Sequence, residues 1–282
     1  MLADSERITW LASYPKSGNT WLRCLIQAYR NNGYLDINDM HTGTGDSSSC
    51  FTRAVSPLPL SDLGERGQWL LRPAALLNAL ISMKSPRMLK THTANVTIAG
   101  LPAFHPPELT QRGIYVVRDP RSVVLSMSSF FGISLPKAVE QMNNLHFQIG
   151  DVDGLQTPQM VSSWSNNVKS WVSSGQTVYP VAVIRYEDMM ENPLKELHQV
   201  IEFLGLEFDE DRGVRAVEAT ELSRLSKVED EKGFEEYKHK DRGKFFNQGG
   251  TRWKDELGPK FIKQIEADHG EVMQELGYAL EY

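Results

Sequence analysis

The sequence predicts an α/β fold in which a central parallel sheet is flanked by helices. Two observations support this prediction. Short and nearly uninterrupted apolar runs occur at 8–14, 114–117 and 181–184, and strands that are apolar on both faces belong to parallel sheets covered on both sides. Each run is followed by a segment with the periodicity of an amphipathic helix, an alternation typical of α/β proteins.

The length and composition are those of one globular domain. The chain has 282 residues, of which 40% are hydrophobic and 23% are charged, and these proportions are usual for globular proteins. No internal repeat and no linker divides the sequence. We therefore expect a single domain over 1–282, which is long enough to bury a full core.

Charge and cysteine content indicate the partners and the compartment. The net charge is −6, whereas proteins that coat nucleic acid carry a basic excess, so we expect no nucleic-acid partner. Cys24 and Cys50 lack the spacing of a disulfide scaffold or a metal site, which favours a reducing, cytoplasmic setting. No secretory signal is evident, and the apolar region 69–83 is too short to span a bilayer, so we expect no membrane partner.

The first strand-to-helix unit covers the N-terminal part of the chain. The strand 8–14 is followed by a turn containing Pro and Gly and then by a helix that Gly33 ends. Apolar side chains share one face of this helix, namely Trp21, Leu22, Leu25, Ile26 and Tyr29. The turn at 15–20 therefore joins the carboxyl end of a strand to the first turn of a helix.

Two later units repeat this pattern. In one, the strand 114–117 leads to Asp119, which can cap a helix, and to Pro120, which suits the first helical position. In the other, the strand 181–184 precedes a helix that opens at 192–193 and closes before Gly205.

Other segments complete the expected elements. Residues 88–90 predict a further short strand, and the stretches 157–173 and 259–277 predict helices. The polar segment 34–68 has no clear periodicity, and we expect it to be a long loop over the sheet edge that acts as a lid on the acceptor site.

The turn after the first strand reads Tyr14-Pro15-Lys16-Ser17-Gly18-Asn19-Thr20-Trp21. In open parallel sheets, ligands bind where strands end and helices begin. The free N–H groups and the positive dipole end of a helix N-terminus favour an anion, usually phosphate. Lys16 adds a positive charge, and small polar side chains add hydrogen-bond donors. Taken alone, the turn is also compatible with an ordinary strand-to-helix connection.

This turn resembles the loop for the 5′-phosphosulfate in the sulfotransferases that use 3′-phosphoadenosine 5′-phosphosulfate (PAPS). Three further segments resemble motifs of this family in the same order, and together they extend from about residue 8 to residue 254. The resemblance implies the P-loop-NTPase-like sulfotransferase fold. It also implies a donor site that includes Lys16, Ser17, Gly18, Asn19, Thr20 and Trp21.

The second matching segment, 115–121, is followed by Ser126. In the family, the corresponding Arg and Ser hold the 3′-phosphate, which implies this role for Arg118 and Ser126. A guanidinium suits the role because it binds phosphate oxygens through a bidentate fork. Without the resemblance, Arg118 is equally compatible with a surface salt bridge.

The third segment, Leu89-Lys90-Thr91-His92, resembles the motif that supplies the catalytic histidine. The resemblance makes His92 the general base, and an imidazole titrates near neutral pH, so it can accept a hydroxyl proton. By the same resemblance, Lys90 neutralises charge on the transferring group.

The fourth segment, 184–189, resembles a motif whose tyrosine contacts the adenine. This implies that Tyr186 contacts the base and that Trp21 stacks on its other side. Ser223 resembles a serine of the adenine pocket.

The C-terminal motif departs from the family. Many members carry Arg-Lys-Gly, whereas this chain has Asn247-Gln248-Gly249-Gly250. Gly249 and Gly250 can still offer backbone N–H groups to the 3′-phosphate. The missing charge could come from Arg252, Arg242 or Lys244, and the sequence does not choose among them.

These matches imply in-line transfer of a sulfuryl group from PAPS to an acceptor hydroxyl, with adenosine 3′,5′-bisphosphate (PAP) as the other product. His92 would be the base and Lys16 would stabilise the leaving phosphate, with no metal. One alternative is a nucleotide-dependent kinase, although the Gly243-Lys244 pair is followed by Phe245 and is not a Walker A loop. Another is a catalytically silent nucleotide-binding protein.

The acceptor is not specified by the sequence. We expect a small molecule or a carrier-bound group, selected by variable segments such as 34–68 and 134–157. The sequence leaves open the oligomeric state and whether the chain is a module of a larger enzyme.

Overall fold

The computed structural model describes residues 2–40, 45–82, 87–97, 100, 104–150, 154–173, 178–237, 243–247 and 252–282. The chain groups into two compact units, each built from three stretches of sequence. Unit 1 comprises 1–14, 44–115 and 143–183, and unit 2 comprises 15–43, 116–142 and 184–282. The expectation of a single domain over 1–282 stays a prediction.

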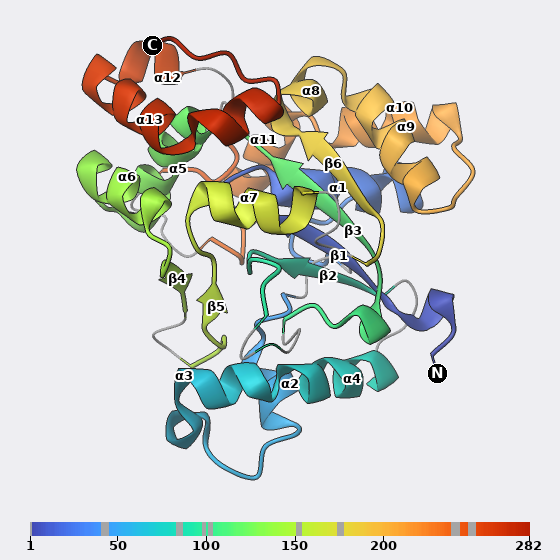
Figure 1. The fold of residues 1–282 in the computed structure, drawn as a ribbon. Coiled ribbons are helices and arrows are strands. Elements are labelled where there is room, and N and C mark those ends of the chain that lie inside the picture. Colours follow the sequence, from blue (N-terminus) through green and yellow to red (C-terminus); the bar gives the residue numbers. More distant parts are fainter. Residues whose placement is uncertain are drawn as a thin grey trace. The chain divides into compact units, whose positions relative to one another are not determined.

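The main sheet has the strand order β2-β1-β3-β6 (Figure 1). Its strands are Ile8–Ser13 (β1), Met88–Thr91 (β2), Thr110–Val117 (β3) and Val181–Arg185 (β6). β1 and β2 run parallel, with Trp10 opposite Leu89. Every residue of β1 is buried, which explains its nearly uninterrupted apolar sequence. The predicted α/β fold with a central parallel sheet is confirmed.

The helices α1 and α5, which follow β1 and β3, and the helix α9 beyond β6 begin where the sequence predicts. A short helix, α8 (Tyr186–Glu191), which was not predicted from the sequence, lies between β6 and α9. The side chain of Asp119 accepts a hydrogen bond from the Arg121 N–H, and Pro120 occupies the first turn of α5. The side chain of Asn192 caps α9 in the same way by accepting from the Lys195 N–H. The longer helices of unit 2 are α1 (Asn19–Arg30), α5 (Pro120–Phe131), α9 (Pro193–Phe203), α10 (Glu210–Ala219), α11 (Leu222–Lys232) and α13 (Pro259–Glu275).

Several shorter elements complete the fold. They are η1 (Asp4–Glu6), η2 (Pro107–Leu109), α2 (Ser49–Arg53), α3 (Leu60–Leu70), α4 (Arg72–Ser82), α6 (Leu135–Asn143), α7 (Trp164–Val172), α8 (Tyr186–Glu191) and α12 (Trp253–Glu256). Two short strands, β4 (Gln148–Ile149) and β5 (Gln159–Met160), form an antiparallel pair.

The helix predicted over 157–173 is wrong in its first part. Residues Gln159–Met160 form β5, which pairs with β4, and Ser162 has a positive φ of 65° that no α-helix accommodates. The helix α7 begins only at Trp164, where the Ser163 side chain accepts from the Asn166 N–H. Strand pairing with β4, which lies outside the predicted helix, overrides the local helical pattern.

The segment 34–68 is not the continuous loop that the sequence predicts, because it contains α2 and most of α3. A kink at Gly64, with φ 59° and ψ 177°, interrupts α3. The kink divides the helix into two short pieces, and pieces of this length show no clear apolar period in the sequence. The role of this segment as a lid stays a prediction.

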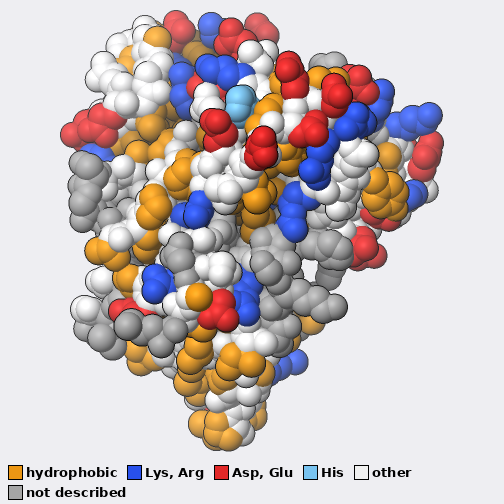
Figure 2. Space-filling view, turned by 90° about the vertical axis from the view of Figure 1, so that its right-hand side faces the viewer, with side chains coloured by type: hydrophobic (Ala, Val, Ile, Leu, Met, Phe, Trp, Pro, Cys, Tyr) orange, Lys and Arg blue, Asp and Glu red, His pale blue; other side chains and the backbone are white. Residues whose placement is uncertain are grey.

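Hydrophobic side chains are exposed on α3 and α4. The exposed fractions of Leu70, Leu77 and Ile81 are 53%, 44% and 77%, and Figure 2 shows hydrophobic side chains at its lower edge, where α2, α3 and α4 lie.

In the described part of the chain, no single helix is long and apolar enough to cross a membrane. Only α5 and α6 taken together, bent by 117°, meet that requirement by length and composition.

Candidate active site

The turn after β1 has a backbone that suits a bound anion. Lys16 and Gly18 have positive φ angles of 67° and 100°, and no side chain caps the first turn of α1, where Asn19 and Thr20 are buried. The Ser17 hydroxyl is also buried and has no hydrogen-bond partner in the part of the chain that the structure describes. A helix N-terminus with an unused buried donor beside it favours a negatively charged ligand.

Gly18 is required in this turn for two reasons. Its φ of 100° is a conformation that L side chains rarely adopt, and a Cβ atom there would collide with the Tyr186 ring. Only glycine lets the ring and the turn approach so closely. This contact brings together two residues that lie far apart in the sequence.

The Lys16 ammonium lies over two aromatic rings. Its Nζ is 3.9 Å from the ring centroid of Phe130 in α5 and 4.2 Å from that of Phe245. Phe245 is held in turn by Glu229 of α11, whose carboxylate accepts from the N–H groups of Phe245 and Phe246 at 2.7 and 2.9 Å. Cation–π attraction therefore orients the one cation of the turn.

Arg118 lies beside the same turn, directly after β3. Its Nη1 donates to the Lys16 carbonyl oxygen at 3.2 Å, and its Cζ lies 4.2 Å from the Tyr186 ring centroid. Its Nε is buried and has no hydrogen-bond partner within the described ranges. The guanidinium thus keeps an unused donor next to the turn, as a phosphate-binding arginine requires.

Trp21 and Tyr186, predicted to lie on opposite sides of an adenine, contact each other. Their ring centroids are 5.8 Å apart at an interplanar angle of 66°, and the Trp21 indole N–H donates to the Thr220 carbonyl oxygen at 3.0 Å. Rings in edge contact leave no space for a planar base between them. The adenine roles of both residues stay predictions.

Glu187 connects three segments of unit 2. Its carboxylate accepts from the Asp119 N–H at 3.1 Å and from the Tyr278 hydroxyl at 2.8 Å. Burial raises the pKa of Glu187, although the hydrogen bonds that it accepts oppose the rise. The carboxylate therefore holds the backbone next to Arg118 in place.

The remaining donor-site residues of the sequence analysis lie in α5, in α11 and near α12. Ser126 is half-buried in α5 and Ser223 is exposed in α11. Arg252 is also exposed, with Nη1 3.5 Å from Glu256 Oε1. Gly249, Gly250 and Arg242 lie outside the described residues.

Lys244, the other candidate cation, faces α11. Its Nζ lies 2.5 Å from Asp230 Oδ2 and 3.0 Å from Ser226 Oγ. Trp253 of the C-terminal motif is buried beneath Arg121, whose Cζ is 3.8 Å from its ring. Each of these contacts attaches the motif to a helix of unit 2.

In unit 1, His92 follows β2 and is oriented by the end of β1. Its Nδ1 lies 2.9 Å from the Ser13 carbonyl oxygen and 3.2 Å from Ser13 Oγ. A carbonyl oxygen only accepts hydrogen bonds, so Nδ1 carries the proton and Nε2 is the basic nitrogen of the neutral ring. This is the tautomer that a general base at Nε2 needs.

Asn167 of α7 fixes the backbone at His92. Its amide donates to the His92 carbonyl oxygen at 3.0 Å and to the Val161 carbonyl oxygen at 2.8 Å, and it accepts from the Tyr115 hydroxyl at 2.7 Å. Asn167 is fully buried. A buried amide with all these partners holds one geometry, because breaking any bond leaves a polar group unsatisfied.

The backbone of Lys90 is tied to the segment before α2. The Asp46 N–H donates to the Lys90 carbonyl oxygen at 2.9 Å, and the Asp46 carboxylate pairs with the buried guanidinium of Arg72. His105 lies beside this pair, and burial lowers its pKa well below the usual value. The Lys90 side chain is half-buried.

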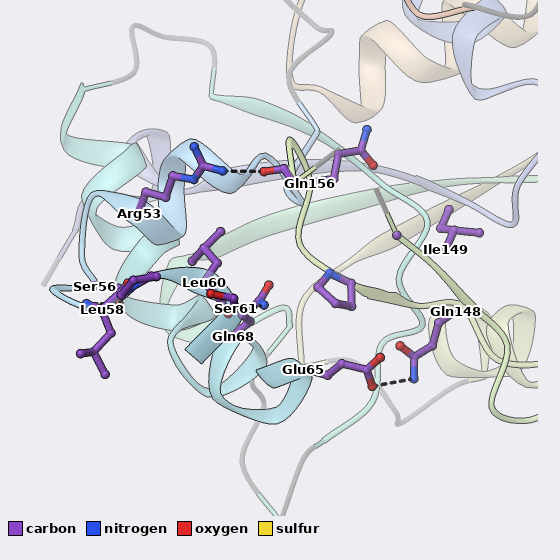
Figure 3. A pocket seen from close by; sticks show the side chains of 14 residues that line it. Arg53, Ser56, Leu58, Leu60, Ser61, Glu65, Gln68, Gln148, Ile149 and Gln156 are labelled. Atoms are coloured by element: carbon purple, nitrogen blue, oxygen red, sulfur yellow. Dashed lines mark hydrogen bonds between the residues drawn. The ribbon is translucent and has the colours of Figure 1, made fainter. Parts of the chain in front are cut away.

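A cavity of about 770 Å³ opens in unit 1. One wall is formed by residues 53–68 of α2, α3 and their connection, and the other by residues 148–150 and 154–158 of β4 and the segment before β5 (Figure 3). Glu65 and Gln148 face each other across it and are joined by a hydrogen bond of 3.5 Å. Both walls belong to the segments that the sequence predicts to select the acceptor.

Sequence reasoning did not find Asn167, Ser13 or Phe130 as parts of the site. Asn167 lies in a helix with no motif, and Phe130 is one of several apolar residues on the face of α5. Only the aromatic lead-in to the C-terminal motif, which contains Phe245, gave any signal. Within the described ranges, no group of three or more His, Cys, Asp or Glu side chains could hold a metal ion.

Comparison with known families identifies the chain. The family model described as "Sulfotransferase domain" matches residues 6–277. The chain belongs to the sulfotransferase family. It is 30% identical over 201 residues to sulfotransferase 1B1 of Canis lupus familiaris, covering 69% of this chain and 57% of that protein. It is 28% identical over 225 residues to sulfotransferase 1A1 of Rattus norvegicus, covering 76% and 65%. These matches span less than two thirds of the relatives' length.

Solved structures support the same fold. A crystal structure of retinol dehydratase in complex with androsterone and the inactive cofactor PAP has a TM-score of 0.61 at 18% identity, covering 100% of this chain and 84% of that one. Mouse sulfotransferase SULT7A1 complexed with PAP has a TM-score of 0.58 at 18% identity, covering 95% and 85%. The predicted sulfotransferase fold is therefore confirmed.

Proposed function

We propose that this protein transfers the sulfuryl group of PAPS to a hydroxyl group of a small-molecule or carrier-bound acceptor and releases PAP. Membership of the sulfotransferase family supports the reaction class. Two similar structures are complexes with PAP, which supports the choice of donor.

The donor site that we propose fits a nucleotide with two phosphate groups. Among the described residues, the Ser17 hydroxyl and the Arg118 Nε are buried donors without partners, and the first turn of α1 has no capping side chain. Ser17 and the helix N-terminus would hold the 5′-phosphosulfate, and Arg118 and Ser126 the 3′-phosphate. Buried unsatisfied donors are costly unless a ligand satisfies them.

In the proposed reaction, the acceptor oxygen forms a bond to sulfur while the bond from sulfur to the bridging phosphate oxygen breaks. His92 accepts the hydroxyl proton at Nε2, and Lys16 stabilises the charge that develops on the bridging oxygen. Lys90 neutralises charge on the transferred group. Positioning and preorganised charge carry most of the catalysis in such a displacement.

The single observation that carries this proposal is the orientation of His92. The carbonyl oxygen that places the proton on its Nδ1 belongs to Ser13, the last residue of the strand that leads into the Lys16 turn.

Transfer of sulfur-35 from labelled PAPS tests the proposal. We expect His92→Ala to lose nearly all turnover while the affinity for PAP, measured by calorimetry, stays unchanged. His198→Ala is the matched control, because His198 is an exposed histidine of α9 that pairs with Glu202. Equal loss of PAP affinity and turnover in His92→Ala would make His92 a structural residue and contradict the proposed base.

A cytoplasmic setting is also part of the proposal. Cys24 and Cys50 are both free thiols, which fits a reducing compartment.

A further inference from the structure

We propose that the cavity of unit 1 binds the acceptor and selects an uncharged, non-aromatic alcohol that carries an amide or a similar carbonyl group. This inference rests on the proposed sulfuryl transfer and names the substrate class that the transfer would use. The cavity volume of about 770 Å³ suits a small organic molecule.

The cavity walls continue into segments that are hydrogen-bonded to the backbone around Lys90 and His92. On one side, the Asp46 N–H donates to the Lys90 carbonyl oxygen at 2.9 Å, and this segment leads into α2. On the other side, the Ala94 N–H donates to the Met160 carbonyl oxygen of β5 at 2.8 Å. The two segments that lead into the walls are therefore hydrogen-bonded to backbone within two residues of the proposed base.

Amide side chains occur on both walls. Gln68 comes from α3, whereas Gln148 and Gln156 come from the opposite wall (Figure 3). The structure gives Gln148 one side-chain hydrogen bond, from its Nε2 to Glu65. A primary amide offers two donors and two acceptor positions. Gln148 can therefore bind a carbonyl or a hydroxyl of a ligand as well.

The apolar part of the lining is aliphatic. It consists of Leu58, Pro59, Leu60, Ile149 and Pro158. No Phe, Tyr or Trp is among the described lining residues, and the stretches outside the described ranges contain none in their sequence. A flat aromatic acceptor would therefore find no ring to stack on, whereas a saturated skeleton packs well against aliphatic side chains.

The charged side chains of the lining already have partners. Arg53 Nη2 donates to the Gly154 carbonyl oxygen at 2.8 Å, and Glu65 accepts from Gln148. A charged acceptor would have to break one of these contacts, and desolvating its own charge would add to the cost. An uncharged acceptor avoids both penalties.

Two compounds of equal size and different ring type test the inference. N-(4-hydroxycyclohexyl)acetamide and N-(4-hydroxyphenyl)acetamide share the hydroxyl and the amide, and only the second is aromatic. Calorimetric binding of each compound to the full chain saturated with PAP gives the dissociation constants without requiring turnover. We expect the saturated compound to bind several-fold more tightly, and Gln148→Leu to weaken its binding by about two- to tenfold through the loss of one hydrogen bond.

Gln199→Leu is the matched control, because Gln199 is exposed on α9 in unit 2. Gln68→Leu provides a second cavity variant should Gln148→Leu fail to fold, as judged by circular dichroism. Tighter binding of the aromatic compound, or equal effects of the cavity and control variants, would overturn the inference. If the saturated compound binds as expected but receives no sulfur-35, the cavity assignment stands and the proposed transfer fails.

Discussion

The Lys16 turn and the His92 strand end hold their key side chains by different physical means. Lys16 is held through its ammonium, which lies over the Phe130 and Phe245 rings. His92 is held through polar contacts, namely the Ser13 carbonyl oxygen at its ring and the Asn167 amide at its backbone.

This difference matches the chemistry that we propose for each residue. A cation that must meet developing negative charge benefits from ring faces, which attract the ammonium and hold it in place. A base needs one defined tautomer, and a hydrogen bond from Nδ1–H to a carbonyl oxygen provides it. We therefore expect changes near Lys16 to affect donor binding and changes near His92 to affect turnover alone.

The largest effect is expected at Arg118. Arg118→Ala removes a guanidinium beside the turn, and the loss of two charge-assisted hydrogen bonds should weaken PAP binding by about 100-fold or more. Calorimetry with PAP measures this. Arg224→Ala is the control, since Arg224 is exposed on α11 and faces only Glu221. Unchanged PAP affinity in Arg118→Ala would place the 3′-phosphate elsewhere.

Asn167→Leu should affect only the region around His92. It removes the amide that fixes His92 and the acceptor to which the Tyr115 hydroxyl donates, so we expect turnover to fall by about tenfold and the free energy of unfolding by about 2 kcal/mol. PAP affinity should not change. Asn166→Leu, at an exposed position next to it, is the control. A loss of PAP affinity in Asn167→Leu would break the separation between the two regions.

The rings at Lys16 can be tested by paired substitutions. Phe245→Leu keeps an apolar side chain but removes the π face, whereas Phe245→Tyr keeps the face. Loss of a cation–π contact of this kind should weaken PAPS affinity by about three- to tenfold. We expect that loss in the leucine variant and near-normal affinity in the tyrosine variant, measured as the KM for PAPS. Equal behaviour of the two variants would mean that the rings only fill space.

The smallest effect is expected at His269, to which we assign no role in the reaction. Burial in α13 lowers the pKa of His269 from 6.5 to about 4, so its stabilising contribution is present above pH 6.5 and is lost as the pH falls through 4. Between pH 7.5 and 5.5 this amounts to roughly 1 kcal/mol. Urea unfolding at both pH values should show that His269→Gln loses less stability on acidification than the wild type. His198→Gln is the exposed control, and equal losses in all three proteins would contradict the assignment.

Much of the fold was predictable because local interactions decide it. The buried run of β1 and the Asp119-Pro120 start of α5 each depend on neighbours in sequence. The prediction of a loop over 34–68 was wrong because the kink at Gly64 leaves no local helical period to detect. The first part of the helix predicted over 157–173 was wrong because β5 pairs with β4, which lies outside that segment.

By itself, the sequence determined the α/β fold, because periodicity and capping express forces between near neighbours. The resemblance to sulfotransferase motifs supplied Lys16 and His92 as candidate site residues. Only the tertiary structure decided which ring faces Lys16, which amide supports His92 and which nitrogen of His92 is basic. The contacts of Phe245, Asn167 and Ser13 join residues far apart in the chain, and such contacts depend on how the whole chain packs.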